Sequence, residues 1–148
     1  MTIEIDIQYA TDKKGIPGPA KIRKWARLGL ADIREEAVMT IRIVDNSESA
    51  ALNKAWRGKN KATNVLSFPA GDNPLMPELF GDLALCAKVI SSEAKQQGKT
   101  LDAHWAHMII HGILHLAGYD HIKPREARKM EAVEISKLQS LKFPNPYE

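Results

Sequence analysis

The segment His111-Gly-Ile-Leu-His115-Leu-Ala-Gly118-Tyr-Asp-His121 constrains this chain more than any other part of the sequence. Residues four apart on a helix lie on one face, one turn apart, so the imidazoles of His111 and His115 can reach the same metal ion. Gly118 is the residue type that often ends a helix in the left-handed conformation, which allows His121 to return as a third ligand. Three protein ligands leave a fourth position open for water, as is typical of a catalytic zinc site.

Two further histidines, His104 and His107, fall near the same face of the predicted helix. His104 lies about 10 Å along the helix axis from His111, too far to bind the same ion. His107 could pair with His111, but only the set His111, His115 and His121 gains a ligand from the turn. We therefore expect His104 and His107 to be structural residues or to orient the ligands.

Position 112 bears on the class of enzyme. Zinc proteases with a His-Glu-x-x-His motif use the glutamate as general base, whereas this chain has Gly112. The spacing of the histidines is therefore protease-like, but the missing base argues against peptide hydrolysis of the usual kind and leaves metal-activated water chemistry open. Asp120 and Asp82 are the candidate substitutes for the missing base, and Asp120 could equally orient an imidazole through a hydrogen bond.

Size and composition indicate an ordinary globular protein. The chain has 148 residues, of which 44% are hydrophobic, and this predicts a single domain over residues 1–148. The net charge of +3 permits an anionic partner. The sequence has neither a signal-peptide pattern nor a run of about 18 apolar residues, and its one cysteine, Cys86, cannot form an internal disulfide. We expect a cytoplasmic protein without a membrane partner.

Hydrophobic periodicity and turn residues predict an α+β fold, in which one mixed four-stranded sheet is packed with about five helices. Asn46 or Ser47 is expected to cap the second helix, which ends at Gly58, and Thr100 to cap the histidine helix. Residues 69–80 contain three prolines and Gly71 and are expected to form a long irregular loop. The predicted strands cover residues 3–9, 39–43, 65–68 and 83–86, and the predicted helices cover residues 21–30, 47–57, 88–97, 101–117 and 124–141.

A basic segment, Arg57-Gly-Lys59-Asn-Lys61, follows the second helix and leads into the third strand. Arginine binds phosphate through two parallel hydrogen bonds, and the two lysines can add further contacts to phosphate groups. Short clusters of this kind are usually solvated surface, so the segment gains weight only beside the other motifs.

Together these motifs resemble the YbeY family of bacterial rRNA maturation factors, which are single-strand-specific endoribonucleases. The resemblance spans most of the chain. Family members usually have aspartate where this chain has Asn64, a common variant. The matching segments, in chain order, are Arg57-Gly-Lys59, Thr63-Asn-Val-Leu-Ser-Phe-Pro69, Gly81-Asp82, His104-Trp-Ala-His107 and the histidine segment.

The resemblance implies a zincin-like, metalloprotease-type fold, with zinc on His111, His115 and His121. It implies that Arg57 is the functional arginine, so Arg57 and His111 are the expected catalytic residues. The implied role is maturation of the 3′ end of small-subunit rRNA and ribosome quality control. The implied partners are rRNA and the small ribosomal subunit, with ribosomal proteins and an assembly GTPase suggested by the family alone, and DNA is not among them.

Two alternatives stay open from the sequence. One is a non-catalytic ribosome-assembly factor that uses a metal only for stability, and the other is a metalloprotease, which Gly112 disfavours. Histidine ligands also accept nickel, copper and iron. Cleavage by water and cleavage by the 2′-hydroxyl of the RNA are both compatible with these residues.

Overall fold

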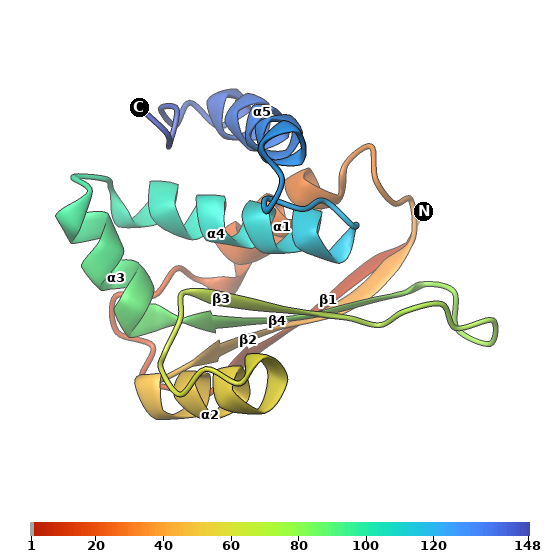
Figure 1. Cartoon of the computed structure of the whole chain (residues 1–148), viewed down its shortest axis with the longest axis horizontal. Coiled ribbons are helices and arrows are strands. Elements are labelled where there is room, and N and C mark those ends of the chain that lie inside the picture. Colours follow the sequence, from red (N-terminus) through yellow and green to blue (C-terminus); the bar gives the residue numbers. More distant parts are fainter. Residues whose placement is uncertain (1) are drawn as a thin grey trace.

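The four strands form one mixed sheet in the order β1-β2-β4-β3. In the computed structural model, which describes residues 2–148, β1 and β2 are parallel, β2 and β4 are parallel, and β3 is antiparallel to β4 (Figure 1). This confirms the predicted α+β class with a mixed four-stranded sheet. The strands are β1 (Ile3–Tyr9), β2 (Ala37–Val44), β3 (Val65–Pro69) and β4 (Leu79–Cys86), and the helices are α1 (Pro19–Leu30), α2 (Asn46–Arg57), α3 (Ala87–Gln96), α4 (Leu101–Leu116) and α5 (Pro124–Ser140).

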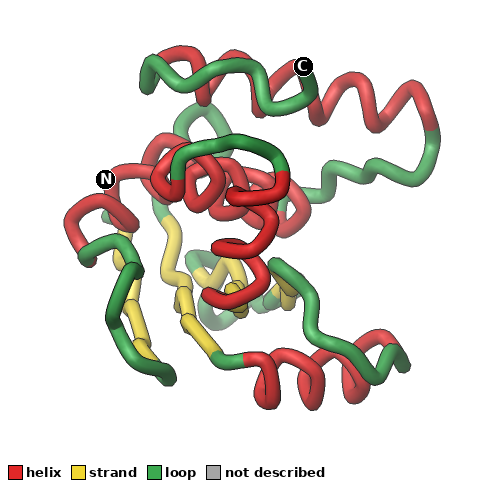
Figure 2. Tube along the Cα trace, turned by 90° about the vertical axis from the view of Figure 1, so that its left-hand side faces the viewer, coloured by secondary structure: helices red, strands yellow, loops and turns green. Residues whose placement is uncertain are grey.

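Helix α4 is the centre of the helical layer. It packs against α1, α3 and α5 and against strands β3 and β4. Helices α1 and α4 cover one face of the sheet, α5 lies outside α4, and α2 lies on the opposite face (Figures 1 and 2). Because α4 is enclosed on several sides, its own apolar residues are distributed around its whole circumference and do not form a single stripe. Trp105, Ile109, Ile110 and Ile113 of α4 are all fully buried.

Gly112 marks the closest approach of α4 to the sheet. A Cβ atom at this position would lie 2.8 Å from Cδ2 of Leu83 and 3.1 Å from Cγ2 of Val65. The absence of a side chain therefore lets α4 lie directly on β3 and β4. A glutamate at position 112 would point into packed strand side chains, so this chain has no room for the general base of the His-Glu-x-x-His proteases.

The ends of α2 and the start of α4 are capped by residues of the expected types, but the N-cap of α2 is not one of the predicted residues. The predicted caps of α2, Asn46 and Ser47, are wrong, because the side chain of Asp45 accepts a hydrogen bond from the backbone N–H of Glu48 over 2.8 Å. Gly58 ends α2 in the left-handed conformation as predicted, with a φ of 72°. Thr100 caps α4 as predicted and accepts from the N–H of Ala103 over 3.1 Å.

Strand β4 begins at Leu79, not at residue 83, so the predicted loop over residues 69–80 is too long. The first half of β4 pairs with β2 across an irregularity between Val38 and Met39, and it also pairs with the end of β3. Gly81 suits this crowded position, because a Cβ there would lie 2.6 Å from the carbonyl oxygen of Phe68. None of the helices in residues 2–148 combines the length and the hydrophobicity that a transmembrane span requires.

Candidate metal centre

Helix α4 and the turn after it bring the three predicted ligands together. His111 and His115 lie one helical turn apart, and their Nε2 atoms are 3.1 Å apart. Nδ1 of His121 lies 2.9 Å from Nε2 of His115. Gly118 makes this return possible with a φ of 100°, and its N–H donates to the carbonyl oxygen of His115 over 3.0 Å.

The three ring nitrogens fit a small divalent transition metal. A tetrahedral zinc ion bound at about 2.0–2.1 Å has ligand atoms roughly 3.3 Å apart, close to the separations seen between these nitrogens. Burial, followed by the neighbouring His111 and His121, lowers the pKa of His115 to about 4. His115 is therefore neutral at physiological pH, and its Nε2 lone pair is available to a metal.

The structure adds a residue that the sequence motifs did not single out. Glu134 of α5 is completely buried, and its Oε1 atom lies 2.9 Å from Nδ1 of His111 and 2.7 Å from Nε2 of His107. Burial raises the pKa of Glu134, but the hydrogen bonds from His107 and His111 outweigh this effect and hold the pKa at about 2. The carboxylate can accept a hydrogen bond from Nδ1 of His111, and Nε2 of the same ring faces His115.

A signal for Glu134 was present in the sequence. It lies between Met130 and Leu138 at four-residue spacing, so it falls on the apolar stripe of α5 that faces the core. A carboxylate in that stripe must be paired when the helix packs, because an unpaired buried charge is costly.

His107, His111 and Glu134 form a second group whose ligand atoms are close enough for a metal. The set His111, His115 and His121 is the better candidate to hold a metal, for two reasons. His107 and Glu134 are buried and already hydrogen-bonded to each other, whereas the other set borders an open hollow. A bond between a carboxylate and a ring N–H needs no ion to stabilise it.

His104 is a structural residue, as expected. Its Nε2 atom lies 2.9 Å from Oε1 of Glu93 on α3, and Nδ2 of Asn64 donates to both carboxylate oxygens of Glu93 over 3.2 Å. Burial lowers the pKa of His104, and the hydrogen bond to Glu93 opposes this shift. The network ties α4 to α3 and to the residue that precedes β3.

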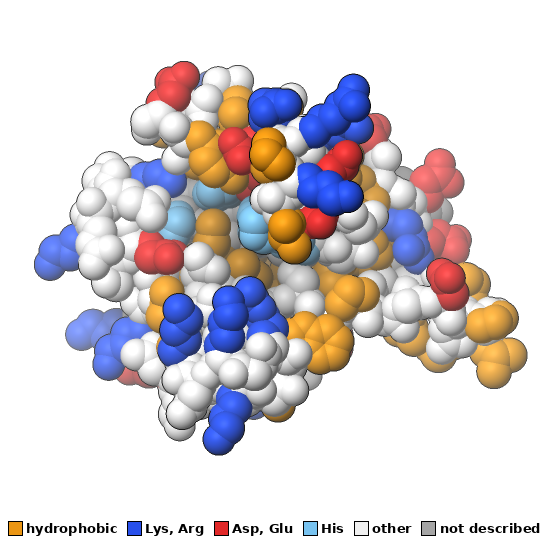
Figure 3. All heavy atoms as spheres, in the orientation of Figure 1, with side chains coloured by type: hydrophobic (Ala, Val, Ile, Leu, Met, Phe, Trp, Pro, Cys, Tyr) orange, Lys and Arg blue, Asp and Glu red, His pale blue; other side chains and the backbone are white. Residues whose placement is uncertain are grey.

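The three histidines border a hollow of about 640 Å³ that Arg57 and Asp120 also line. Histidine side chains are visible in this depression, and Lys and Arg side chains gather along one rim (Figure 3). Lys59 and Lys61 are exposed on the adjoining loop and do not line the hollow.

The two candidate base residues are placed differently. The carboxylate of Asp120 lies at the hollow, but it accepts a hydrogen bond from the N–H of Ile122 over 2.9 Å, so it stabilises the turn rather than orienting an imidazole. Asp82 alternates along β4 with Gly81 and Leu83, which face α4, and it therefore lies on the opposite face of the sheet. The structure does not bring Asp82 to the histidines.

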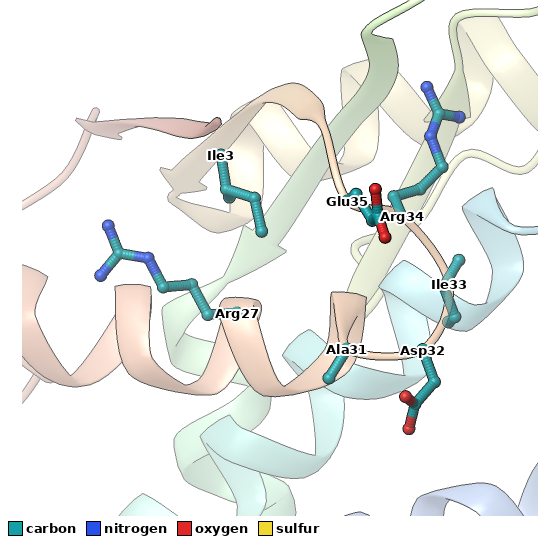
Figure 4. A pocket seen from close by; sticks show the side chains of 7 residues that line it. All are labelled: Ile3, Arg27, Ala31, Asp32, Ile33, Arg34 and Glu35. Atoms are coloured by element: carbon teal, nitrogen blue, oxygen red, sulfur yellow. The ribbon is translucent and has the colours of Figure 1, made fainter. Parts of the chain in front are cut away.

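A second hollow, of about 700 Å³, lies beyond the end of α1 and has no comparable site. Its charged side chains include Arg27, Asp32 and Arg34, and these point away from one another (Figure 4). The histidine hollow, in contrast, brings several groups capable of chemistry together.

The fold is α+β, and its central helix and the following turn present three converging imidazoles, a set that could hold a metal ion, to a hollow with a basic rim. The chain matches the family described as Endoribonuclease YbeY over residues 7–142, and it belongs to this YbeY endoribonuclease family. This confirms the family predicted from the motifs.

Known relatives agree over nearly the whole chain. Proteins named Endoribonuclease YbeY from Pseudomonas syringae pv. syringae and from Pseudomonas savastanoi pv. phaseolicola are each 50% identical over 147 residues, covering 98% of this chain and 88% of the relative. The solution structure of TM1509 from Thermotoga maritima is similar with a TM-score of 0.61 and 24% identity, covering 91% of this chain and 88% of that one. That similarity supports the fold.

Proposed function

We propose that this protein is a metal-dependent endoribonuclease that cleaves single-stranded RNA, in 3′ end maturation of small-subunit rRNA and in ribosome quality control. The observation that supports this most is the convergence of three imidazoles on one hollow that Arg57 also lines. Relatives named as endoribonucleases that are 50% identical to this chain support the same activity.

Zinc is the proposed ion, held by His111, His115 and His121. Three imidazole nitrogens at these separations suit zinc, although other divalent transition metals bind imidazole as well. When bound, the ion supplies a Lewis acid that polarises a phosphate oxygen and lowers the pKa of water.

Arg57 is proposed to bind the scissile phosphate. Its guanidinium can donate two parallel hydrogen bonds to non-bridging oxygens and stabilise the negative charge that builds on them during cleavage. Lys59 and Lys61, exposed on the next loop, would attract phosphates further along the RNA. Among residues 2–148, Asp120 contributes the one carboxylate that lines the hollow, so it is the candidate to accept the proton of the attacking hydroxyl group.

The partners follow from the proposed role. The substrate would be rRNA within the small ribosomal subunit, in the cytoplasm, and the family resemblance adds ribosomal proteins and an assembly GTPase. The metalloprotease alternative loses support, because position 112 is packed against β3 and β4 and has no room for a glutamate.

The decisive test compares cleavage of a single-stranded rRNA fragment by the metal-loaded protein and by the variants Arg57→Ala and His115→Ala, all purified identically. We expect cleavage by the wild type alone, with Arg57→Ala retaining its metal. Equal cleavage by all three would indicate a contaminating nuclease. No cleavage by any of them, with RNA or ribosome binding preserved, would favour the non-catalytic assembly factor instead.

The ends of the products distinguish the two chemical routes. A 2′,3′-cyclic phosphate would show that the 2′-hydroxyl of the RNA attacks the phosphorus. Products that carry only a 5′-phosphate and a 3′-hydroxyl would show attack by water. Both routes use Arg57 in the same way, so the expected loss of cleavage in Arg57→Ala holds for either of them.

A further inference from the structure

The last residues of the chain reach the candidate metal centre through the buried carboxylate of Glu134. The hydroxyl of Tyr147 lies 3.0 Å from both carboxylate oxygens, and the same carboxylate lies 2.9 Å from Nδ1 of His111. One carboxylate on α5 therefore links the C-terminal segment to a proposed metal ligand on α4.

Tyr147 is held in place by more than this hydroxyl. Its ring meets the ring of His107 edge to face, with centroids 5.4 Å apart at 86°, and its backbone N–H donates to Oδ1 of Asn145 over 2.8 Å. The side chain covers the buried network from outside while remaining partly exposed itself. The C-terminal segment thus forms a strap across the outer side of Glu134.

The hydroxyl of Tyr147 is the donor, and the carboxylate of Glu134 the acceptor, in the contact between them. Burial, with the negative charge of Glu134, raises the pKa of Tyr147, so its hydroxyl stays protonated and donates to the carboxylate. Since an ionised carboxylate only accepts hydrogen bonds, His107 and His111 must donate to it as well. Within residues 2–148, Nδ1 of His107 has no hydrogen-bond partner, so this ring joins the network through Nε2.

We propose that Glu134, and Tyr147 through it, are positioning residues that set the affinity of the metal centre. With the proton of His111 held on Nδ1 by Glu134, its Nε2 atom faces His115 and His121 as a lone-pair donor. Tyr147 fixes the carboxylate so that Oε1 stays at His111. Carboxylate partners of metal-binding histidines commonly change metal affinity by about 10- to 100-fold when they are removed.

The first test is Tyr147→Phe, which keeps the ring and removes only the hydroxyl. Tyr9→Phe is the matched control, because the hydroxyl of Tyr9 also donates one hydrogen bond of 3.0 Å, to the carbonyl oxygen of Pro17, away from the histidines. Zinc affinity is measured by competition with a chromophoric chelator, and stability by urea unfolding of the metal-free proteins. We expect Tyr147→Phe to bind zinc several-fold more weakly, while Tyr9→Phe binds it as the wild type does.

The second test, Glu134→Gln, keeps the size of the side chain and removes its charge. We expect zinc affinity to fall by about 10- to 100-fold. Nitrogen-15 NMR of the metal-free protein should show the proton of His111 on Nδ1 in the wild type and displaced from it in this variant. Cobalt(II) absorption reports the same site, and its visible bands should shift in both variants but not in Tyr9→Phe.

The inference rests on the proposed metal site, and the two can fail separately. If the wild type bound neither zinc nor cobalt at these histidines, the metal site itself would be wrong, and this inference with it. If the wild type binds and Tyr147→Phe, which keeps the fold, matches it in affinity and cobalt spectrum, only the positioning role is refuted. Should Glu134→Gln not fold, the Tyr147→Phe comparison still decides.

Discussion

The hydroxyl of Ser67 on β3 donates a hydrogen bond of 3.1 Å to the backbone carbonyl of Gly112 on α4. This bond joins the edge strand to the helix that carries two of the candidate ligands, next to His111 itself. One wall of the hollow and the helix that carries His111 and His115 are thus fixed to each other, with Gly112 as the point of contact.

Gly112→Ala should destabilise the protein. The added methyl group would lie within 3.2 Å of both Cδ atoms of Leu83 and 3.1 Å from Val65, and overpacking of a core of this kind costs about 1–3 kcal/mol. The higher helix propensity of alanine returns about 1 kcal/mol, so we expect a net loss on the order of 1 kcal/mol in urea unfolding. Gly18→Ala, where the space is open, is the control. A more stable Gly112→Ala protein would show that Leu83 and Val65 move far enough to accommodate the added methyl group.

His121→Ala should remove metal binding and leave the metal-free fold intact. The side chain of His121 is exposed on the turn after α4, and it contributes a ring nitrogen at 2.9 Å from His115 but no core packing. We expect the variant to lose tight zinc binding in chelator competition, with an unchanged urea midpoint without metal. One equivalent of zinc bound at wild-type affinity would contradict the three-ligand assignment.

The double variant Lys59→Ala/Lys61→Ala should weaken RNA binding without abolishing cleavage. Both lysines are exposed next to the hollow but do not line it, so they can attract phosphates without touching the reacting group. The slope of log affinity against log salt should become less steep by about 0.7 for each phosphate that a lysine no longer neutralises. Lys14→Ala/Lys24→Ala, on segments that contribute nothing to the hollow, controls for net charge. An equal decrease in affinity in both double variants would mean that only overall charge matters.

His104 should make the protein less stable in mild acid. Burial holds its pKa below the ordinary value of 6.5, so the unfolded chain takes up the proton at a higher pH than the folded protein does. Stability therefore decreases as the pH falls below 6.5 toward the folded pKa.

His104→Gln tests this contribution, because glutamine can still donate to Glu93 but does not titrate. Urea midpoints of the metal-free proteins should fall less for the variant than for the wild type between about pH 7.5 and about pH 5.5. Parallel pH profiles would show that other groups account for the acid sensitivity.

The sequence predicted the local parts of this molecule well and the long-range parts poorly, for a physical reason. His111, His115 and Gly118 act through helix geometry and a turn, which neighbouring residues determine, and the structure places them as expected. Glu134 and Tyr147 join His111 only after α5 and the C-terminal segment pack, and no local pattern reports that pairing.

The beginning of β4 was missed for a similar reason. Gly71 and the three prolines of residues 69–80 predict a loop when the segment is considered alone. This segment is a strand because it pairs with neighbouring strands. Residues 79–82 pair with β2 on one side, and Gly81 and Asp82 also pair with β3 on the other. The close approach of Gly81 to Phe68 depends on that neighbour and not on the local sequence.

The burial of α4 has a consequence for how this protein can change over evolutionary time. The helix that presents His111 and His115 is also the helix whose other faces fill the core against α1, α3, α5 and the sheet. A substitution that shifts the core by a few tenths of an ångström therefore moves two ligands relative to the third, which sits on a separate turn. Substitutions in the interior and retention of the candidate metal centre are therefore coupled, because two of its histidines lie on the core helix and the third on the exposed turn after it.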